Sequence, residues 1–91
     1  MELTTHSIER CKERLNLNEK SLQRMAEKAL KEGKSHSECK GKLRKYLNKL
    51  WLKYKTANNP KIHGEVLFLF KDDILITLYQ IPLELRKWIK L

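Results

Sequence analysis

The chain changes its pattern of hydrophobic residues once, at residues 57–60, and this change limits what it can fold into. Before this point, apolar residues recur every three or four positions among charged ones, which is the pattern of amphipathic helices. After Pro60 the chain is rich in Val, Ile, Leu and Phe, which favour strands. Pro60 itself disfavours helical geometry in the residue before it. The sequence therefore predicts an α+β fold, with helices first and strands second.

The first half predicts three helices. The third has the clearest pattern, because six apolar or aromatic residues between Leu43 and Tyr54 fall within about a third of the helical circumference. Serine, threonine and asparagine favour helix starts, and glycine favours helix ends. The predicted helices are residues 5–15 with Thr5 as N-cap, a second from Asn16 or Asn18 to Gly33, and a third over residues 42–54.

The second half predicts two strands, Ile62–Phe70 and Ile74–Ile81, joined by a tight hairpin turn. Both strands are apolar on both faces at their centres, so the sheet is expected to be covered on two sides. If Asp72-Asp73 forms a two-residue turn, Phe68 lies opposite Thr77. The strand pair thus forms a small antiparallel sheet.

Ninety-one residues allow one small domain, divided into a basic helical half (1–56), a β-hairpin (60–82) and a C-terminal helix or tail (83–91). This length excludes a full dinucleotide-binding domain. No run approaches the roughly 20 apolar residues of a membrane span, and no secretory signal is visible. Two cysteines 28 positions apart suit a reducing compartment. These features predict a cytoplasmic protein without a membrane partner.

The net charge of +9 is concentrated in the first half. Residues 1–56 hold 15 basic and 7 acidic side chains, whereas residues 57–91 hold 5 and 4. A strong and localised basic surplus is typical of proteins that bind a polyanion. Nucleic acid is therefore the expected partner.

His6, Arg10 and Arg14 form the first candidate site. Their i, i+4, i+8 spacing places them in one stripe along the first predicted helix. An imidazole that titrates near neutral pH, next to two permanent cations, suits a phosphodiester: histidine moves a proton and arginine holds phosphate oxygens. The alternative is a solvated helix face on which the arginines pair with Glu9 and Glu13.

A basic flank on the third predicted helix forms the second candidate site, since residues 40–55 contain no acid. Ordinary surface helices interleave glutamate among lysines to reduce self-repulsion, so an acid-free helix favours a polyanion over a merely solvated face. The flank would span about 16 Å, enough for a few backbone phosphates. It comprises Lys42, Lys45, Lys49 and Lys53 on one side, and Arg44 and Lys55 on the other.

Four further residues carry groups that could act on a phosphate. Thr77 and Tyr79 offer hydroxyl donors on a strand, and Thr77 is also an ordinary strand residue. His36 and His63 are auxiliary proton-transfer candidates or surface histidines. No metal is expected, because the His36-x-x-Cys39 spacing lacks a paired Cys-x-x-Cys. No phosphate-binding loop or dinucleotide motif is present, so no cofactor is expected.

Several stretches resemble small basic phage and mobile-element proteins of Firmicutes. The opening His-x-x-Glu-Arg-x-x-Glu-Arg pattern is the most distinctive of them. The similar stretches are His6–Arg14, His36–Gly41, Ala57–Asn59 and Leu75–Pro82. The chain also resembles, more loosely, the barnase, EndoU, colicin and RelE-type ribonuclease toxin fold. This second resemblance implies that His6 transfers a proton, Arg10 binds phosphate and Thr77 donates a hydroxyl.

Three functions remain open on these grounds. The first is a metal-independent endoribonuclease, in which a ribose 2′-OH attacks the adjacent phosphate; RNA is expected over DNA. The second is a non-catalytic nucleic-acid-binding module, with Tyr46 or Tyr54 stacking on bases. The third is a phage-encoded inhibitor that binds a host protein through Trp51, Trp88 and Tyr79. A protein partner, either a host factor or an antitoxin, therefore also stays open. A core position is nevertheless the default expectation for Trp51.

Overall fold

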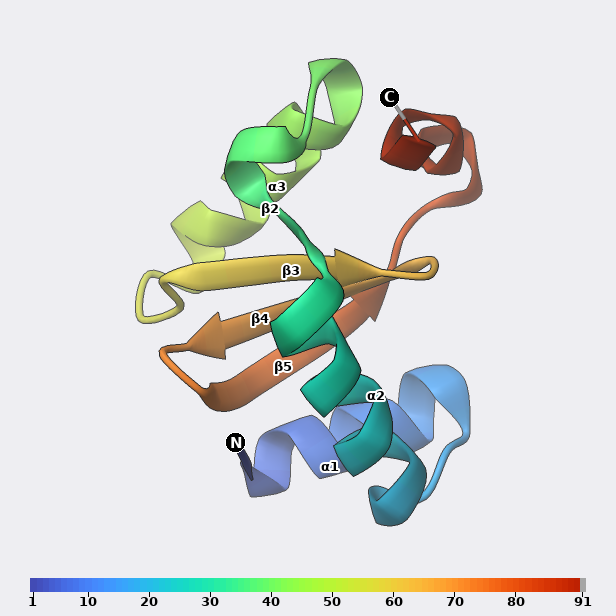
Figure 1. Ribbon diagram of the computed structural model, residues 1–91, viewed down its shortest axis with the longest axis vertical. Coiled ribbons are helices and arrows are strands. Elements are labelled where there is room, and N and C mark those ends of the chain that lie inside the picture. The colour runs from blue at the N-terminus through green and yellow to red at the C-terminus, as the bar shows by residue number, and fades with distance from the viewer. Residues whose placement is uncertain (91) are drawn as a thin grey trace.

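The computed structural model describes residues 1–90 and shows a mixed five-stranded sheet between two layers of helices (Figure 1). The strand order is β1-β5-β4-β3-β2, with β1 parallel to β5 and the other neighbours antiparallel. The α+β class predicted from the sequence is therefore confirmed. The strands are β1 (Glu2–Leu3), β2 (Lys34–Ser35), β3 (Asn59–His63), β4 (Val66–Lys71) and β5 (Ile74–Gln80). The helices are α1 (Thr5–Leu15), α2 (Glu19–Glu32), α3 (Gly41–Lys53) and the 3-10 helices η1 (His36–Glu38) and η2 (Leu83–Lys90).

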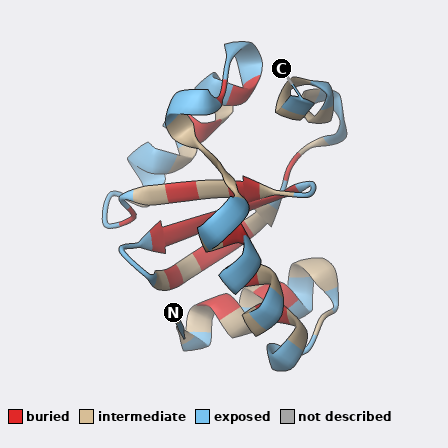
Figure 2. Cartoon of the chain, viewed as in Figure 1, coloured by how far each residue is buried: buried red, intermediate tan, exposed pale blue. Residues whose placement is uncertain are grey.

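Helices cover both faces of the sheet, as the apolar strands predict. α1 and α2 lie on one face, and α3 and η2 lie on the other (Figure 1). Buried residues gather on the strands and on the helix sides that face them (Figure 2). The core on the α1/α2 face includes Cys11, Leu22, Ala26, Phe68, Phe70, Leu75 and Leu78. The core on the α3/η2 face includes Leu43, Leu47, Ile62, Leu67, Leu69 and Ile81.

Side-chain caps fix where the first two helices begin. Thr4, not the predicted Thr5, caps α1: its Oγ1 accepts a hydrogen bond from the Ser7 amide at 3.0 Å, and Ser7 Oγ accepts one from the Thr4 amide at 3.1 Å. α1 ends where Asn16 takes a left-handed conformation with φ of 55°. Asn18 then caps α2. The three predicted helices are thus present, and their ends lie within a few residues of the predicted ones.

The predicted continuous strand over residues 62–70 is wrong. The chain turns at Gly64, where φ is +62°, and β3 and β4 form a hairpin around this turn. Glycine takes this left-handed geometry without the steric penalty of a Cβ atom. In addition, β1 precedes the helices, and β2 and η1 lie between α2 and α3. The predicted order of three helices followed by one hairpin therefore matches the fold only in part.

The pairing of β4 with β5 also differs from the prediction. The two-residue turn is present, and Phe70 lies opposite Leu75 as expected. A β-bulge at Ile76 then shifts the register by one residue, so that Leu69, not Phe68, lies opposite Thr77. A one-residue shift moves each later side chain to the other face of the sheet. Thr77 therefore shares the face of Leu69, which α3 covers.

None of the helices within residues 1–90 is both long enough and apolar enough to cross a membrane.

Candidate nucleic-acid interface

The lysine flank of α3 borders a cavity. Leu43 and Leu47 are buried and anchor α3 on the sheet, so the adjacent side of the helix is left at the surface. There, the side chains of α3 and one residue of η2 line a hollow of about 280 Å³ that is open to solvent. We call this cavity the lysine pocket. It is lined by Lys42, Lys45, Tyr46, Lys49 and Leu85.

No ion pair within residues 1–90 neutralises the positive charge of the lysine pocket. None of its three lysines forms an ion pair with an acid in residues 1–90. The stretch from residue 39 to residue 64 contains no Asp or Glu, so α3 and its flanking segments supply no counter-charge. Neighbouring ammonium groups without acids raise the local concentration of anions. The lysine pocket is therefore suited to a ligand with several negative charges.

The inner surface of the lysine pocket is apolar. Tyr46 is half-buried, and this burial raises the pKa of its hydroxyl. The positive charge of Arg14 acts in the opposite direction on the pKa of the same hydroxyl. Leu85 contributes a second apolar wall from η2. The pocket thus joins an aromatic and aliphatic interior to a cationic rim.

Arg14 extends from α1 across an edge of the sheet. β1 pairs only with Ile74 and Leu75, so the rest of β5 has no strand on that side. Arg14 Nη1 donates a hydrogen bond of 2.7 Å to the Leu78 carbonyl, and the guanidinium carbon lies 4.1 Å from the centre of the Tyr79 ring. This contact satisfies a carbonyl that an open strand edge would leave free. It also carries a positive charge from the α1 layer to the α3 side.

The tyrosine under Arg14 belongs to a small aromatic cluster. The Tyr79 hydroxyl donates a hydrogen bond of 2.6 Å to the Tyr54 hydroxyl. Burial, followed by this hydrogen bond, raises the pKa of Tyr79 to about 12. Lys53 Nζ lies 5.7 Å from the centre of the Tyr54 ring. Tyr79, expected as a free hydroxyl donor, is therefore engaged with Tyr54, while Lys53 extends the basic surface.

The structure does not bring His6, Arg10 and Thr77 together in one cavity. His6 is half-buried on α1, and its Nε2 atom has no hydrogen-bond partner within residues 1–90. Arg10 Nη1 lies 2.8 Å from Glu13 Oε2, as in the alternative of a surface ion pair. Thr77 is fully buried, its Oγ1 atom also has no hydrogen-bond partner in the described part of the chain, and its side chain lies on the α3 face. The sheet therefore separates Thr77 from the layer that carries His6 and Arg10.

The auxiliary candidates lie elsewhere. His36 Nε2 is 2.8 Å from Asn48 Oδ1, and the His36 ring meets Trp51 edge-on with the ring centres 5.8 Å apart. His63 is the last residue of β3. Arg44 is exposed on α3 and does not line the lysine pocket. The expectation that Trp51 lies in the core is wrong, because 39% of it is exposed.

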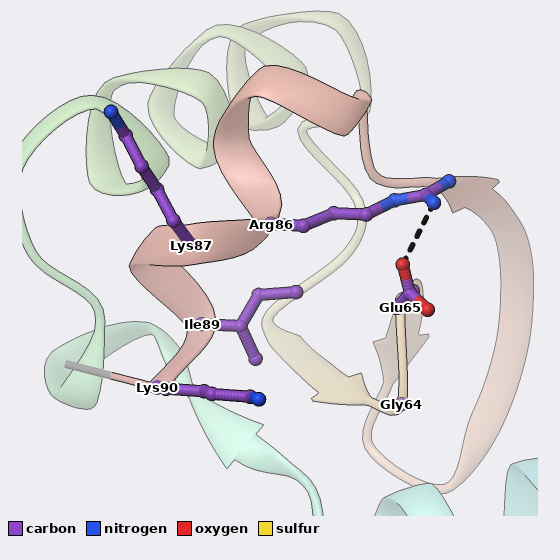
Figure 3. A pocket seen from close by; sticks show the side chains of 6 residues that line it. All are labelled: Gly64, Glu65, Arg86, Lys87, Ile89 and Lys90. Carbon is purple, nitrogen blue, oxygen red and sulfur yellow. Dashed lines mark ion pairs between the residues drawn. The ribbon is translucent and has the colours of Figure 1, made fainter.

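A larger cavity of about 600 Å³ lies between η2 and the β3–β4 turn (Figure 3). Figure 3 shows Arg86 reaching from η2 toward Glu65, and their ion pair measures 2.8 Å. Arg86 Nε also donates to the Ile81 carbonyl at 3.0 Å. This cavity thus contains an acid, Glu65, whereas the lysine pocket has none in its lining. The larger cavity is lined by Gly64, Glu65, Arg86, Lys87, Ile89 and Lys90.

Sequence reasoning identified the lysines and Tyr46 but missed Leu85 as a pocket wall. The position of Leu85 depends on how η2 packs on α3, where the Trp88 ring covers Gly41. No local sequence pattern indicates such a contact between distant segments.

Within residues 1–90, no three His, Cys, Asp or Glu side chains form a group that could hold a metal ion. Burial raises the pKa of both cysteine thiols, Cys11 and Cys39.

No protein-family model, curated protein or solved structure matches this chain. The resemblance to phage proteins and ribonuclease toxins therefore stays a hypothesis. Function has to be argued from the site, since a fold alone does not define it.

Proposed function

We propose that this protein is a nucleic-acid-binding module that holds a phosphate backbone at the lysine pocket of α3 and does not cleave it. The observation that carries this proposal is the group of three lysines without acidic partners around one cavity. The sequence analysis expects RNA over DNA, and the lysines alone would hold the phosphate backbone of either polymer.

The spacing of the lysines suits consecutive phosphates. Lys42 and Lys49 lie seven residues apart on α3, about 10 Å along the helix axis. Lys45 lies between them, and Lys53 continues the row. Lysines that neutralise phosphates release condensed counterions, which drives binding and makes it fall with salt. The basic flank therefore explains affinity without requiring a sequence-specific contact.

The geometry favours binding over catalysis. General acid–base cleavage requires the proton-transfer group and the phosphate ligands to converge on one reacting atom. Thr77 lies on the opposite face of the sheet from α1, and Arg10 is paired with Glu13. Accordingly, labelled RNA incubated with the protein in EDTA is expected to stay intact.

Binding is tested with a labelled single-stranded RNA by fluorescence anisotropy at increasing salt. The test variant is Lys42→Gln/Lys45→Gln/Lys49→Gln, and the control is Lys12→Gln/Lys20→Gln/Lys28→Gln, which removes the same charge from exposed positions on α1 and α2. We expect the slope of log K against log salt to be less steep by about 2 in the test variant. Each of the three lost lysine–phosphate contacts accounts for roughly 0.7 of the steepness on a single strand. The control is expected to change this slope little.

Two results would contradict the proposal. Equal losses in both triple variants would show that only the net charge matters. If wild-type protein does not bind RNA even at low salt, the proposed nucleic-acid-binding function is wrong. Capture of a protein from a nuclease-treated lysate, together with that second result, would favour the inhibitor hypothesis instead.

A further inference from the structure

We infer that the lysine pocket receives an unstacked nucleobase, so that its ligand is a single strand and not a duplex. This inference rests on the proposed function and adds the kind of nucleic acid that the site takes. It follows from the combination of an apolar interior with a cationic rim.

The interior of the lysine pocket has no role in binding phosphate alone. A phosphate needs only the ammonium groups, which stand at the ends of flexible stems and remain in water. Tyr46 and Leu85, however, line the same cavity with a ring and an aliphatic side chain. A ligand that fills the pocket must therefore carry an apolar, flat part next to its negative charge. A nucleotide unit within a strand has both.

The size of the lysine pocket fits one base. Its volume of about 280 Å³ lies just below the range of roughly 300–1,000 Å³ typical of pockets for drug-sized ligands. A single base can enter and stack on Tyr46, since every base has a π-face. In a duplex, both faces of each base are already covered, and extrusion of one base costs free energy. The pocket is consequently expected to bind single strands more tightly than duplexes and to accept strands of different sequence.

The segment that carries Leu85 is packed on the rest of the protein before any ligand binds. η2 carries Leu85, and the Trp88 ring of η2 packs against Gly41 at the start of α3 so closely that a Cβ atom there would lie 2.5 Å from Trp88 Cζ3. Lys34 Nζ donates a hydrogen bond of 2.8 Å to the Ile89 carbonyl and ties η2 to the sheet. The apolar part of the pocket is therefore held in place before binding, which lowers the ordering cost of binding.

The decisive probe is an abasic strand. A short single-stranded RNA is compared with a strand of the same length in which the bases are replaced by abasic sites, and with a blunt duplex of the same sequence. We expect the intact strand to bind about tenfold or more tightly than the abasic strand, because stacking of one base on an aromatic side chain accounts for that much. Single-stranded DNA of the same sequence is expected to bind as well, since neither stacking nor the lysines requires a 2′-hydroxyl.

Variants link this preference to the pocket. Tyr46→Phe keeps the ring and is expected to keep the preference for the intact strand, whereas Tyr46→Leu loses it. Leu85→Ser removes the second wall and is expected to lower the affinity for the intact strand about threefold or more. Leu83→Ser is the matched control on η2, because Leu83 is 75% exposed and does not line the pocket.

The outcomes separate this inference from the proposed function. Equal affinity for intact and abasic strands, with the salt dependence still set by the α3 lysines, would overturn base insertion and leave backbone binding intact. Base insertion would also be overturned if the duplex bound more tightly than the single strand. The same holds if single-stranded RNA bound and single-stranded DNA did not. If no strand binds at low salt, the proposed function itself fails.

Discussion

The guanidinium carbon of Arg14 lies 4.1 Å from the centre of the Tyr79 ring, and Nη1 of the same side chain donates to the neighbouring Leu78 carbonyl at 2.7 Å. One side chain thus closes the edge of β5 that β1 leaves open and joins the two helical layers around the sheet. Its positive charge reaches Tyr46, at the lysine pocket. Arg14 is therefore expected to contribute to stability as well as to the basic surface.

Arg14→Ala should lower the free energy of unfolding by about 2–3 kcal/mol, because it removes a charge-assisted hydrogen bond and a cation–π contact. Arg10→Ala on the same helix is the matched control and should cost no more than about 1 kcal/mol, since its partner Glu13 is exposed. Urea denaturation of the three proteins measures both values. Equal losses would show that the contact with β5 is not stabilising.

Gly41→Ala should destabilise the protein more than Gly64→Ala. Both glycines have φ near +60°, and both substitutions incur the left-handed penalty of about 1–2 kcal/mol. Only at Gly41 does the added Cβ meet another group, the Trp88 ring, so overpacking adds about 1–3 kcal/mol. Urea denaturation checks the stability difference.

The fluorescence of Trp88, followed in a Trp51→Phe background, reports whether η2 has left α3. We expect a red shift of the emission in Gly41→Ala and none in Gly64→Ala. Equal stability and unchanged emission in the two variants would contradict the packing of Trp88 on Gly41.

Periodicity predicted the long elements because the spacing of their buried residues is visible within each element's own sequence. In α3, Leu43 and Leu47 lie one turn apart and both are buried, as the stripe in the sequence indicates. β1 and β2 contain two residues each, too few for any pattern to show. They are strands only because β5 and β3 pair with them.

The bulge at Ile76 could not be predicted, since tertiary contacts determine it. β1 pairs with Ile74 and Leu75, and Thr4 Oγ1 donates to the Leu75 carbonyl at 2.9 Å, so the start of β5 is held from outside the hairpin. Asn58 holds the turn itself by accepting a hydrogen bond from the Asp72 amide at 2.8 Å. A hairpin considered alone gives the unbulged register, which moves Thr77 to the wrong face of the sheet. The grouping of Thr77 with His6 came from the ribonuclease resemblance, and the bulged register does not place Thr77 on the face that carries His6.

Stability should fall between about pH 10 and pH 12 through the ionisation of Tyr79. Its pKa is raised from 10.0 to about 12 in the folded protein by burial and by the hydrogen bond that its hydroxyl donates to Tyr54. In this interval the unfolded chain loses the proton and the folded protein keeps it, so the unfolded state binds fewer protons and the free energy of unfolding decreases as pH rises. Below pH 10 this contribution is fully present.

Absorbance of tyrosinate during an alkaline titration checks the shift, and Tyr79→Phe assigns the late-titrating group. Tyr54→Phe should lower the pKa of Tyr79, because the acceptor that favours its protonated form is lost. If the titration of Tyr79 in Tyr54→Phe matches that in wild type, the hydrogen bond does not contribute.

Thr77→Val distinguishes a structural role of Thr77 from a catalytic one. Thr77 is fully buried and its Oγ1 has no hydrogen-bond partner in residues 1–90, so the hydroxyl is desolvated without compensation. Valine has nearly the same shape and no polar atom, and it favours strands. We therefore expect the variant to be more stable than wild type by about 1 kcal/mol in urea denaturation. RNA binding should be unchanged, because the lysine pocket is lined by other residues. The opposite result is that wild-type protein cleaves RNA in EDTA and that Thr77→Val abolishes this cleavage. Thr77 would then act on the phosphate, as the ribonuclease resemblance implies, and the proposed non-catalytic function would be wrong.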